Sequence, residues 1–432
     1  MKKIFVSMGL AVVGAAGLPG LNAQDMAGAS PKAWNIAASL RGFYDDNYAV
    51  AHDKKGSFGF EVSPSVSANV DLKQTDIGVR YTFGAYYYQQ RQDSGLDAFD
   101  YTHSAEVWLD HAFTERWKLN VSDSLAIAQD PALLQGAGSP IRVNGDNVAN
   151  RAKVSLDTQW TRQFSTKAFY GNSVYIYSDK GTNNPVSPSQ AAILNRMEQN
   201  VGIDFQWTLQ PETMVFIGYN YSWVRFDENQ EISPSIILIN PPNPPRLIKY
   251  YSDSRDNNSH YGYLGVSHTF SPNLSAQVKA GASYTDNFND PISPSTSLSP
   301  YADISLTYTY TPGSYVQAGF TQDINSTDVV QPGANGHLTQ YQQSSVIYLD
   351  INHRFSPKLS AALVSQYQYS SYQEGAFSGT GDSDVNVGIN LNYQINRHLA
   401  AEAGYNYDTL LSDIVGRDNN RSRVYLGLTA NY

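Results

Sequence analysis

Regular alternation of apolar and polar residues is the feature that most constrains the fold of this chain, and it is clearest between residues 57 and 72. The even positions hold Phe58, Phe60, Val62 and further mostly apolar residues up to Leu72, whereas the odd positions hold Gly, Glu, Ser, Asn and Asp. A period of two gives an extended strand one apolar face and one polar face. This segment is therefore predicted to be a β-strand that separates an apolar medium from water.

The same alternation recurs along the chain and defines 18 predicted strands. Most of them contain 9 to 16 residues, which is long for a soluble β-sandwich but suits a tilted transmembrane strand of about 9 to 11 embedded residues. The predicted fold is an all-β, transmembrane antiparallel barrel of 18 strands, with 16 as the alternative if one hairpin is miscounted. The predicted strands are residues 34–44, 57–72, 76–89, 104–113, 118–129, 148–163, 167–178, 195–209, 214–226, 257–269, 274–286, 300–310, 315–323, 344–354, 359–371, 384–394, 399–408 and 421–432.

The connections between these strands alternate between short and long. The long links run to about thirty residues and are rich in Asp, Asn, Gly, Ser and Pro. Barrels of the bacterial outer membrane combine short periplasmic turns with longer extracellular loops and an even number of strands. Both ends of the barrel segment are therefore expected on the periplasmic side. The short turns are residues 73–75, 114–117, 164–166, 210–213, 270–273, 311–314, 355–358 and 395–398.

The first 23 residues are interpreted as a secretory signal peptide and not as part of the barrel. A positively charged start precedes an apolar run that ends near Leu18, and a small-residue site predicts cleavage between Ala23 and Gln24. This order is typical of a signal peptide. A membrane anchor is the alternative, but the apolar run is short and interrupted by Gly and Pro. Residues 24–33 are then expected to be a short periplasmic segment, and residues 34–432 to form the barrel.

Composition and charge argue against a disulfide-stabilised fold and against binding of nucleic acid. The chain contains no cysteine, so no disulfide framework can hold it together. Loss of the two lysines of the signal peptide would change the formal net charge from −10 to −12, and this charge is spread along the chain. No basic cluster is present that could neutralise phosphates, which argues against nucleic acid as a partner. No cofactor is expected.

A histidine or another ring-bearing residue precedes several of the short turns at matched positions. The stretch from His268 to Pro272 recurs as His353 to Pro357. A metal site is one interpretation of matched histidines, but Trp and Tyr occupy the equivalent positions in other turns. This substitution favours an aromatic girdle at the periplasmic membrane interface. The predicted girdle residues are His111, Trp207, His268, Tyr308, His353 and Tyr393.

The last predicted strand ends in alternating apolar residues and finishes on an aromatic residue. A strand of this form resembles the assembly signal of outer-membrane proteins, so the barrel-assembly machinery is an expected partner, together with outer-membrane lipid. The residues of this predicted signal are Val424, Leu426, Leu428, Ala430 and Tyr432.

Four stretches carry a family resemblance, namely residues 42–47 (GFYDDN), 56–64 (GSFGFEVSP), 144–147 (NGDN) and 403–408 (AGYNYD). They resemble an outer-membrane β-barrel porin family that is associated with exopolysaccharide and exosortase systems. The resemblance covers essentially the whole chain after the signal peptide. It implies a porin fold and leaves the transported substance open.

Charged residues on the polar faces of the predicted strands are candidates to line a lumen. An 18-stranded barrel is wide enough to hold water, and only about ten residues precede the first strand, so no amino-terminal plug domain is expected. The expected function is a porin-like channel for passive diffusion of small hydrophilic solutes. Because positive and negative charges are mixed, the channel is expected to be weakly selective, with a slight preference for cations. The candidates are Arg41, Glu61, Arg80, Glu106, Asp110, Arg151, Lys153, Asp157, Asp204, Lys279, Asp303, Asp350 and Arg423.

Two other functions remain open from the sequence. An outer-membrane component of exopolysaccharide export or surface assembly would have export partners and could stack oligosaccharide rings on Tyr86, Tyr175, Tyr263 and Tyr425. An outer-membrane enzyme that modifies lipid or polysaccharide would need a nucleophile, a base and an orienting group in one place. The sequence contains no motif of that kind, so no catalytic residue is predicted.

One long link is too apolar to extend freely into water. Residues 228–254 contain the run from Ser235 to Ile239, followed by a proline-rich stretch. We expect this link to pack into the lumen or against a partner. The link from Asp130 to Asn147 is the second choice for a segment that narrows the lumen.

Overall fold

The computed structural model describes residues 33–432 except 95–96, 135–137, 180–187, 228 and 239–243. The predicted signal peptide, its cleavage site at Ala23 and Gln24, and nearly all of the segment 24–33 lie outside the described residues.

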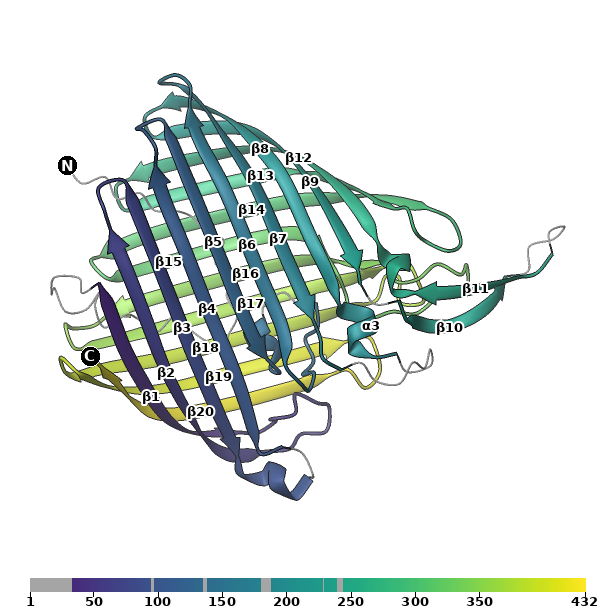
Figure 1. Ribbon diagram of the computed structural model, residues 1–432, viewed down its shortest axis with the longest axis horizontal. Helices are drawn as coiled ribbons and strands as arrows, with labels where there is room; N and C mark the ends of the chain where they lie inside the picture. Colours follow the sequence, from purple (N-terminus) through teal and green to yellow (C-terminus); the bar gives the residue numbers. More distant parts are fainter. Residues whose placement is uncertain (1–32, 95–96, 135–137, 180–187, 228, 239–243) are drawn as a thin grey trace.

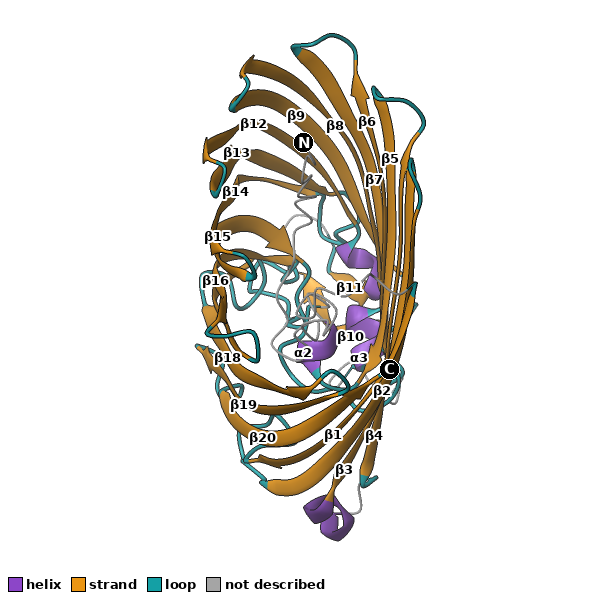
Figure 2. Ribbon diagram, turned by 90° about the vertical axis from the view of Figure 1, so that its left-hand side faces the viewer, coloured by secondary structure: helices purple, strands orange, loops and turns teal. Residues whose placement is uncertain are grey.

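Eighteen antiparallel strands form one closed barrel, which confirms the predicted fold and strand number (Figures 1 and 2). Each strand pairs with its neighbours in chain order, β9 pairs with β12, and β1 pairs with β20 to close the ring. The barrel strands are β1 (Trp34–Asp45), β2 (Ser57–Asp71), β3 (Thr75–Tyr88), β4 (Phe99–Ala112), β5 (Trp117–Ala128), β6 (Asn147–Gln159), β7 (Phe164–Ile176), β8 (Arg196–Gln210), β9 (Thr213–Phe226), β12 (Asn257–Ser271), β13 (Leu274–Asn287), β14 (Ser295–Thr311), β15 (Ser314–Asn325), β16 (Tyr341–Arg354), β17 (Leu359–Gln373), β18 (Gly381–Asn396), β19 (Leu399–Ser412) and β20 (Asn419–Asn431).

The alternation in the sequence becomes an alternation between the outside and the inside of the barrel. On β2, Phe58 and Val66 are 58% and 46% exposed on the outer face, whereas Glu61 is only 4% exposed. Successive side chains of a strand point to opposite faces. Apolar side chains exposed around the whole ring therefore form the surface that faces lipid, and the polar positions between them face the lumen.

Short turns and long loops lie at opposite ends of the barrel, as the sequence predicts. The short connections are the turns at 72–74, 113–116, 160–163, 211–212, 272–273, 312–313, 355–358 and 397–398. Trp34 and Tyr432 lie at this same end, where their ring centroids are 5.8 Å apart. The two ends are called the short-turn end and the long-loop end below.

The apolar link between β9 and β12 folds in a way that the sequence did not predict. It forms a two-stranded hairpin of β10 (Glu231–Leu238) and β11 (Arg246–Tyr251), which extends beyond the long-loop end of the barrel (Figure 1). Ile232, Ile248 and Tyr250 at its base are buried against neighbouring loops, in a cluster that includes Leu338. The base of the link is buried among loops outside the barrel, so packing into the lumen, the first of the two predicted placements, is wrong. Ile237 and Leu247 remain 66% and 62% exposed, and packing against a partner stays a prediction.

The helical segments are short and belong to the loops. They are η1 (Gln89–Ser94), α2 (Pro131–Leu134), α3 (Gln190–Leu194) and η2 (Ser252–Arg255). Among the described residues, no helix combines the length and the apolar composition needed to cross a membrane.

Candidate functional site

The loop of residues 129–146, called the lumen loop below, places its described residues, 129–134 and 138–146, in the interior of the barrel. Its helix α2 lies within the ring of strands (Figure 2). Asp130 Oδ2 accepts a hydrogen bond of 2.6 Å from Arg421 on β20, and the Ser139 hydroxyl donates one of 2.9 Å to Asp328 in the loop between β15 and β16. Both partners belong to the side of the ring that lies away from β5 and β6, where the lumen loop begins and ends. The link from Asp130 to Asn147, which was the second choice in the sequence analysis, is therefore the segment that narrows the lumen.

Local chemistry explains how the lumen loop starts its inward course. Asp130 caps α2, because its Oδ1 accepts a hydrogen bond of 3.0 Å from the backbone N–H of Ala132. Proline at the next position, Pro131, is favoured in the first turn of a helix because it lacks an N–H that would need a partner. Gly138 has a φ of +92°, and a Cβ there would lie 3.2 Å from the carbonyl oxygen of Ser326. A side chain at this position would strain the backbone and crowd the opposite loop.

On the side of β6, the lumen loop is fixed by apolar burial and by one arginine. Leu134 is 2% exposed and packs in a cluster with Ala149, Tyr175 and Leu194. Arg151 on β6 donates a hydrogen bond of 2.5 Å to the Leu134 carbonyl oxygen. Contacts with both sides of the barrel therefore fix the position of the lumen loop.

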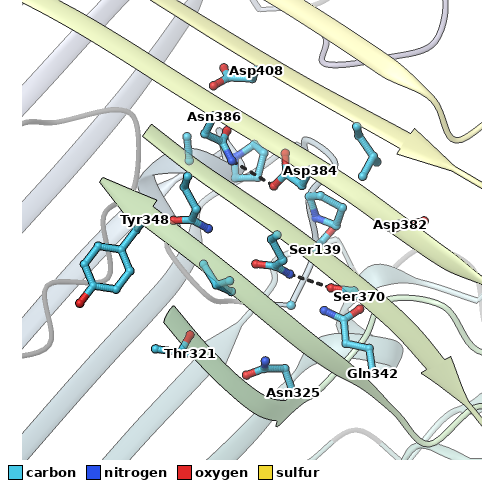
Figure 3. Close-up of a pocket in the computed structure, with 18 of the residues that line it drawn as sticks. Ser139, Thr321, Asn325, Gln342, Tyr348, Ser370, Asp382, Asp384, Asn386 and Asp408 are labelled. Atoms are coloured by element: carbon cyan, nitrogen blue, oxygen red, sulfur yellow. Dashed lines mark hydrogen bonds between the residues drawn. The ribbon is translucent and has the colours of Figure 1, made fainter. Parts of the chain in front are cut away.

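A cavity of about 370 Å³ lies between the lumen loop and the inner faces of β14 to β20 (Figure 3). On one side it is lined by Asp130, Pro131 and Ser139. On the other side the charged lining consists of Arg421 and five carboxylates, of which Asp382 is paired with Arg417. We call the other four, Asp303, Asp323, Asp384 and Asp408, the acidic wall. The cavity is therefore a narrow aqueous space with one strongly acidic side.

Most carboxylates of the acidic wall have no ion-pair partner. Apart from Arg354 beside a short turn, every charged residue at an inward position of β14 to β19 is a carboxylate. Among the described residues, the acidic wall has a single ion pair, between Asp303 and Lys279 at 3.5 Å. Asp384 accepts a hydrogen bond from Asn386, and Asp408 Oδ1 is buried with no hydrogen-bond partner. Uncompensated carboxylates in a confined space concentrate cations.

Arginines on β1 and β20, the strands that follow the acidic wall around the ring, are by contrast paired with neighbouring acids. Arg41 bridges Glu61 at 3.1 Å and Glu402 at 2.9 Å. Arg421 donates to Asp45 as well as to Asp130, and both carboxylates are buried. These paired arginines brace the barrel and the lumen loop, so they offset little of the negative charge of the acidic wall.

The pKa of Asp130 reflects this bracing. Burial alone would raise it, but the charge and the hydrogen bond of Arg421 outweigh burial and lower the pKa to about 2. The carboxylate therefore stays ionised at neutral pH and keeps the lumen loop tied to β20.

The 13 charged residues predicted to line the lumen all fall on inward positions of their strands, and some of them meet. Arg41 contacts Glu61, Arg80 lies 3.2 Å from Glu106, and Lys279 pairs with Asp303. Of the 13, only Asp303 lines the narrow cavity. That these residues line a conducting path stays a prediction.

The predicted girdle residues lie on outward positions near the short-turn end. His111, His268 and His353 each pack edge-on against the phenylalanine two residues later, with ring centroids 4.4 to 4.5 Å apart. The residues of the predicted assembly signal also point outward on β20, where Leu426 and Tyr432 are 68% and 67% exposed. Their roles at the membrane and in assembly stay predictions.

Four residues of the site were missed from the sequence. Asp323, Asp384 and Asp408 share the inward register of residues that were chosen, so the same alternation could have identified them. Arg421 shares the inward register of Arg423 in the same way, but alternation does not show that it pairs with Asp130, which is 291 residues away in the chain.

Comparisons with known proteins agree with this architecture. The family model described as "Putative beta-barrel porin 2" matches residues 35–432. Solved structures of similar shape include OccAB4 of Acinetobacter baumannii, with 12% identity, a TM-score of 0.41 and coverage of 93% of this chain and 99% of that one. The OpdK protein of Pseudomonas aeruginosa has 10% identity, a TM-score of 0.43 and coverage of 92% and 99%. The siderophore receptor PiuA of Acinetobacter baumannii has 9% identity, a TM-score of 0.46 and coverage of 93% and 82%. A search of curated protein sequences finds no match.

Since the family model spans nearly the whole described chain, the chain belongs to this β-barrel porin family, and it is a porin-like barrel of the bacterial outer membrane.

Proposed function

We propose that this barrel is a non-enzymatic channel for passive diffusion of small hydrophilic solutes, with a weak preference for cations. The observation that carries the proposal is the narrow cavity between the lumen loop and the acidic wall. The loop limits the size of a solute, and the uncompensated carboxylates favour positive charge. On the opposite side of the ring, β6 and β7 carry Lys153 and Lys167 at inward positions, which keeps the preference weak.

A conduit for a polymer is less well supported than a channel for small solutes. The lumen loop crosses the interior and is tied at both sides. The tyrosines that could have stacked on sugar rings already contact cations: Arg196 lies 4.2 Å from the ring centroid of Tyr175, and Arg423 lies 5.1 Å from that of Tyr86. Tyr425 and Tyr263 have similar partners in Arg41 and Lys279. These rings brace the wall and offer little free surface to a saccharide.

The remaining parts of the chain fit this role. Export through a cleaved signal peptide and recognition of the last strand by the barrel-assembly machinery belong to the same proposal. The outward apolar residues of every strand supply the contact with outer-membrane lipid.

Purified protein in a planar lipid bilayer tests the channel directly. We expect discrete single-channel currents, together with swelling of protein-containing liposomes in small sugars and amino acids but not in large oligosaccharides. Absence of any current from correctly folded protein would overturn the proposal. Current that only long oligosaccharides block, with no passage of small solutes, would support a saccharide conduit instead.

The acidic wall predicts how charge selectivity responds to mutation. In the variant D323N/D384N/D408N, removal of three uncompensated carboxylates should shift the reversal potential in a KCl gradient from the cation side towards zero or beyond. The matched control is D53N/E115Q/E212Q, which neutralises three exposed carboxylates outside the lumen and should leave the reversal potential unchanged. Equal shifts in both variants would show that the acidic wall does not set selectivity.

A further inference from the structure

Three loops at the long-loop end bring a histidine and two carboxylates together. Asp290 lies in the loop between β13 and β14, His337 in the loop between β15 and β16, and Glu374 in the loop between β17 and β18. His337 Nδ1 is 3.0 Å from Asp290 Oδ2. One nitrogen or oxygen from each of the three residues lies within 4.8 Å of the other two. None of these residues belongs to the lumen cavity or to the acidic wall.

Burial and hydrogen bonding distinguish this cluster from an ordinary patch of surface acids. The Asp290 side chain is fully buried. Glu374 Oε2 is buried and has no hydrogen-bond partner. Gln340, 1% exposed, donates from Nε2 to Asp290 Oδ2 at 3.0 Å, while its own Oε1 is buried without a partner. Buried oxygens are nearly always satisfied in proteins, so the unsatisfied oxygen of Glu374 beside a histidine and a buried carboxylate indicates a site that accepts a cation.

The backbone around the cluster is firmly held. Glu374 has a φ of +61°, which is rare for a residue with a side chain and aims the carboxyl group from a tight turn. The neighbouring loops exchange backbone hydrogen bonds, from Ala376 to Gln331 at 3.1 Å and within the turn from Gly333 to His337 at 2.9 Å. Tyr250 of the β10–β11 hairpin donates to the Gly336 carbonyl oxygen at 2.6 Å. The three side chains are thus positioned by a scaffold from several parts of the chain.

We propose that Asp290, His337 and Glu374 bind one divalent transition-metal ion, of the Zn²⁺ or Mn²⁺ type. One imidazole nitrogen with two carboxylate oxygens suits such ions, whereas Ca²⁺ and Mg²⁺ prefer oxygen ligands alone. The hydrogen bond from Gln340 orients Asp290, as groups behind a metal ligand commonly do. The ion ties three loops and, through Gly336 and Tyr250, the base of the outer hairpin into one unit.

Metal binding to the full-length protein in detergent tests the proposal. After treatment with a chelator and removal of the chelator, the protein is titrated with Zn²⁺ by calorimetry and with Mn²⁺ by electron paramagnetic resonance. We expect one ion per chain for at least one of the two metals. The variants E374Q and H337Q should each weaken binding by at least about tenfold. The control H52Q, which replaces an exposed histidine of another loop, should bind like the parent protein.

A salt bridge between a protonated His337 and its acidic neighbours is the competing explanation, and the same experiment separates the two. If the parent protein binds neither metal at a stoichiometry near one, or if E374Q binds as tightly as the parent, the metal site is wrong. E374Q keeps the size of the side chain, so it decides the question even if H337Q fails to assemble; heat-modifiable mobility in gels reports assembly for each variant. Because the readout is binding, failure here leaves the proposed channel function standing.

Discussion

Excision of residues 131–141 from the lumen loop, with a short Gly-Ser link in their place, is expected to raise the single-channel conductance several-fold. The lumen loop reaches from β5 and β6 to Arg421 and to the loop between β15 and β16. Without it, the lumen would keep the width of the bare 18-stranded barrel, and wide barrels conduct through an aqueous interior. Single-channel recording in 1 M KCl, with the parent protein in parallel, measures the effect.

The outer hairpin supplies the matched control for this excision. Removal of residues 234–247 shortens the chain by more than the excision does, but it affects only a hairpin that lies beyond the barrel (Figure 1), so the conductance should not change. If the hairpin deletion raises conductance as much as the excision does, or if the excision has no effect, the lumen loop is not the constriction.

Replacement of Arg421 by alanine is expected to lower the free energy of unfolding by about 3–5 kcal/mol. Arg421 is 4% exposed and donates to Asp45 at 2.8 Å and to Asp130 at 2.6 Å. Its loss would leave two buried carboxylates without their cation, and an uncompensated buried charge is strongly destabilising. Unfolding by urea in the presence of lipid vesicles measures the change, and increased current noise should accompany it because the lumen loop loses its tie to β20.

An arginine outside such a network provides the comparison. Arg397 is exposed in a short turn, so R397A should change stability by no more than about 0.5 kcal/mol. If R421A costs as little as R397A, the buried ion pairs do not hold the lumen loop in place.

The tie between Asp130 and Arg421 should also resist acid. The pKa of Asp130 is lowered from 3.8 to about 2, so the tie contributes its full stability above about pH 4 and loses it as the pH falls towards 2. The difference in stability between the parent protein and D130N should therefore be constant from pH 7 to 5 and shrink only below about pH 4. A difference that already disappears between pH 6 and 5 would contradict this assignment.

The barrel itself could be predicted from the sequence because lipid enforces a period of two on every strand. β2 and β20 show why: their exposed residues, such as Val66 and Leu426, alternate with residues that face water. Strand ends follow the alternation less closely. β14 starts at Ser295, five residues before the predicted position, because its first residues lie outside the region where the alternation is clear.

The loops could not be predicted in the same way, because their structure depends on contacts between distant parts of the chain. The run from Ser235 to Ile239 is apolar, but the sequence does not say that Leu338 helps to bury the hairpin that contains most of it. The approach of His337 to Asp290 and Glu374 depends on the closed ring in the same way, since three separate loops must meet at one rim. Alternation shows which face of a strand a residue occupies. A cluster built from several loops depends instead on which loops the closed barrel brings together.

The long reach of the lumen loop also implies an order of events during folding. Asp130 is 291 residues from Arg421, and Ser139 is 189 residues from Asp328. Arg421 belongs to β20, the strand that completes the ring with β1. Bringing such distant segments together early would cost chain entropy before any neighbouring contacts offset it. We therefore expect the barrel to close first with an unobstructed interior, and the lumen loop to dock against β20 as a late step that narrows the lumen.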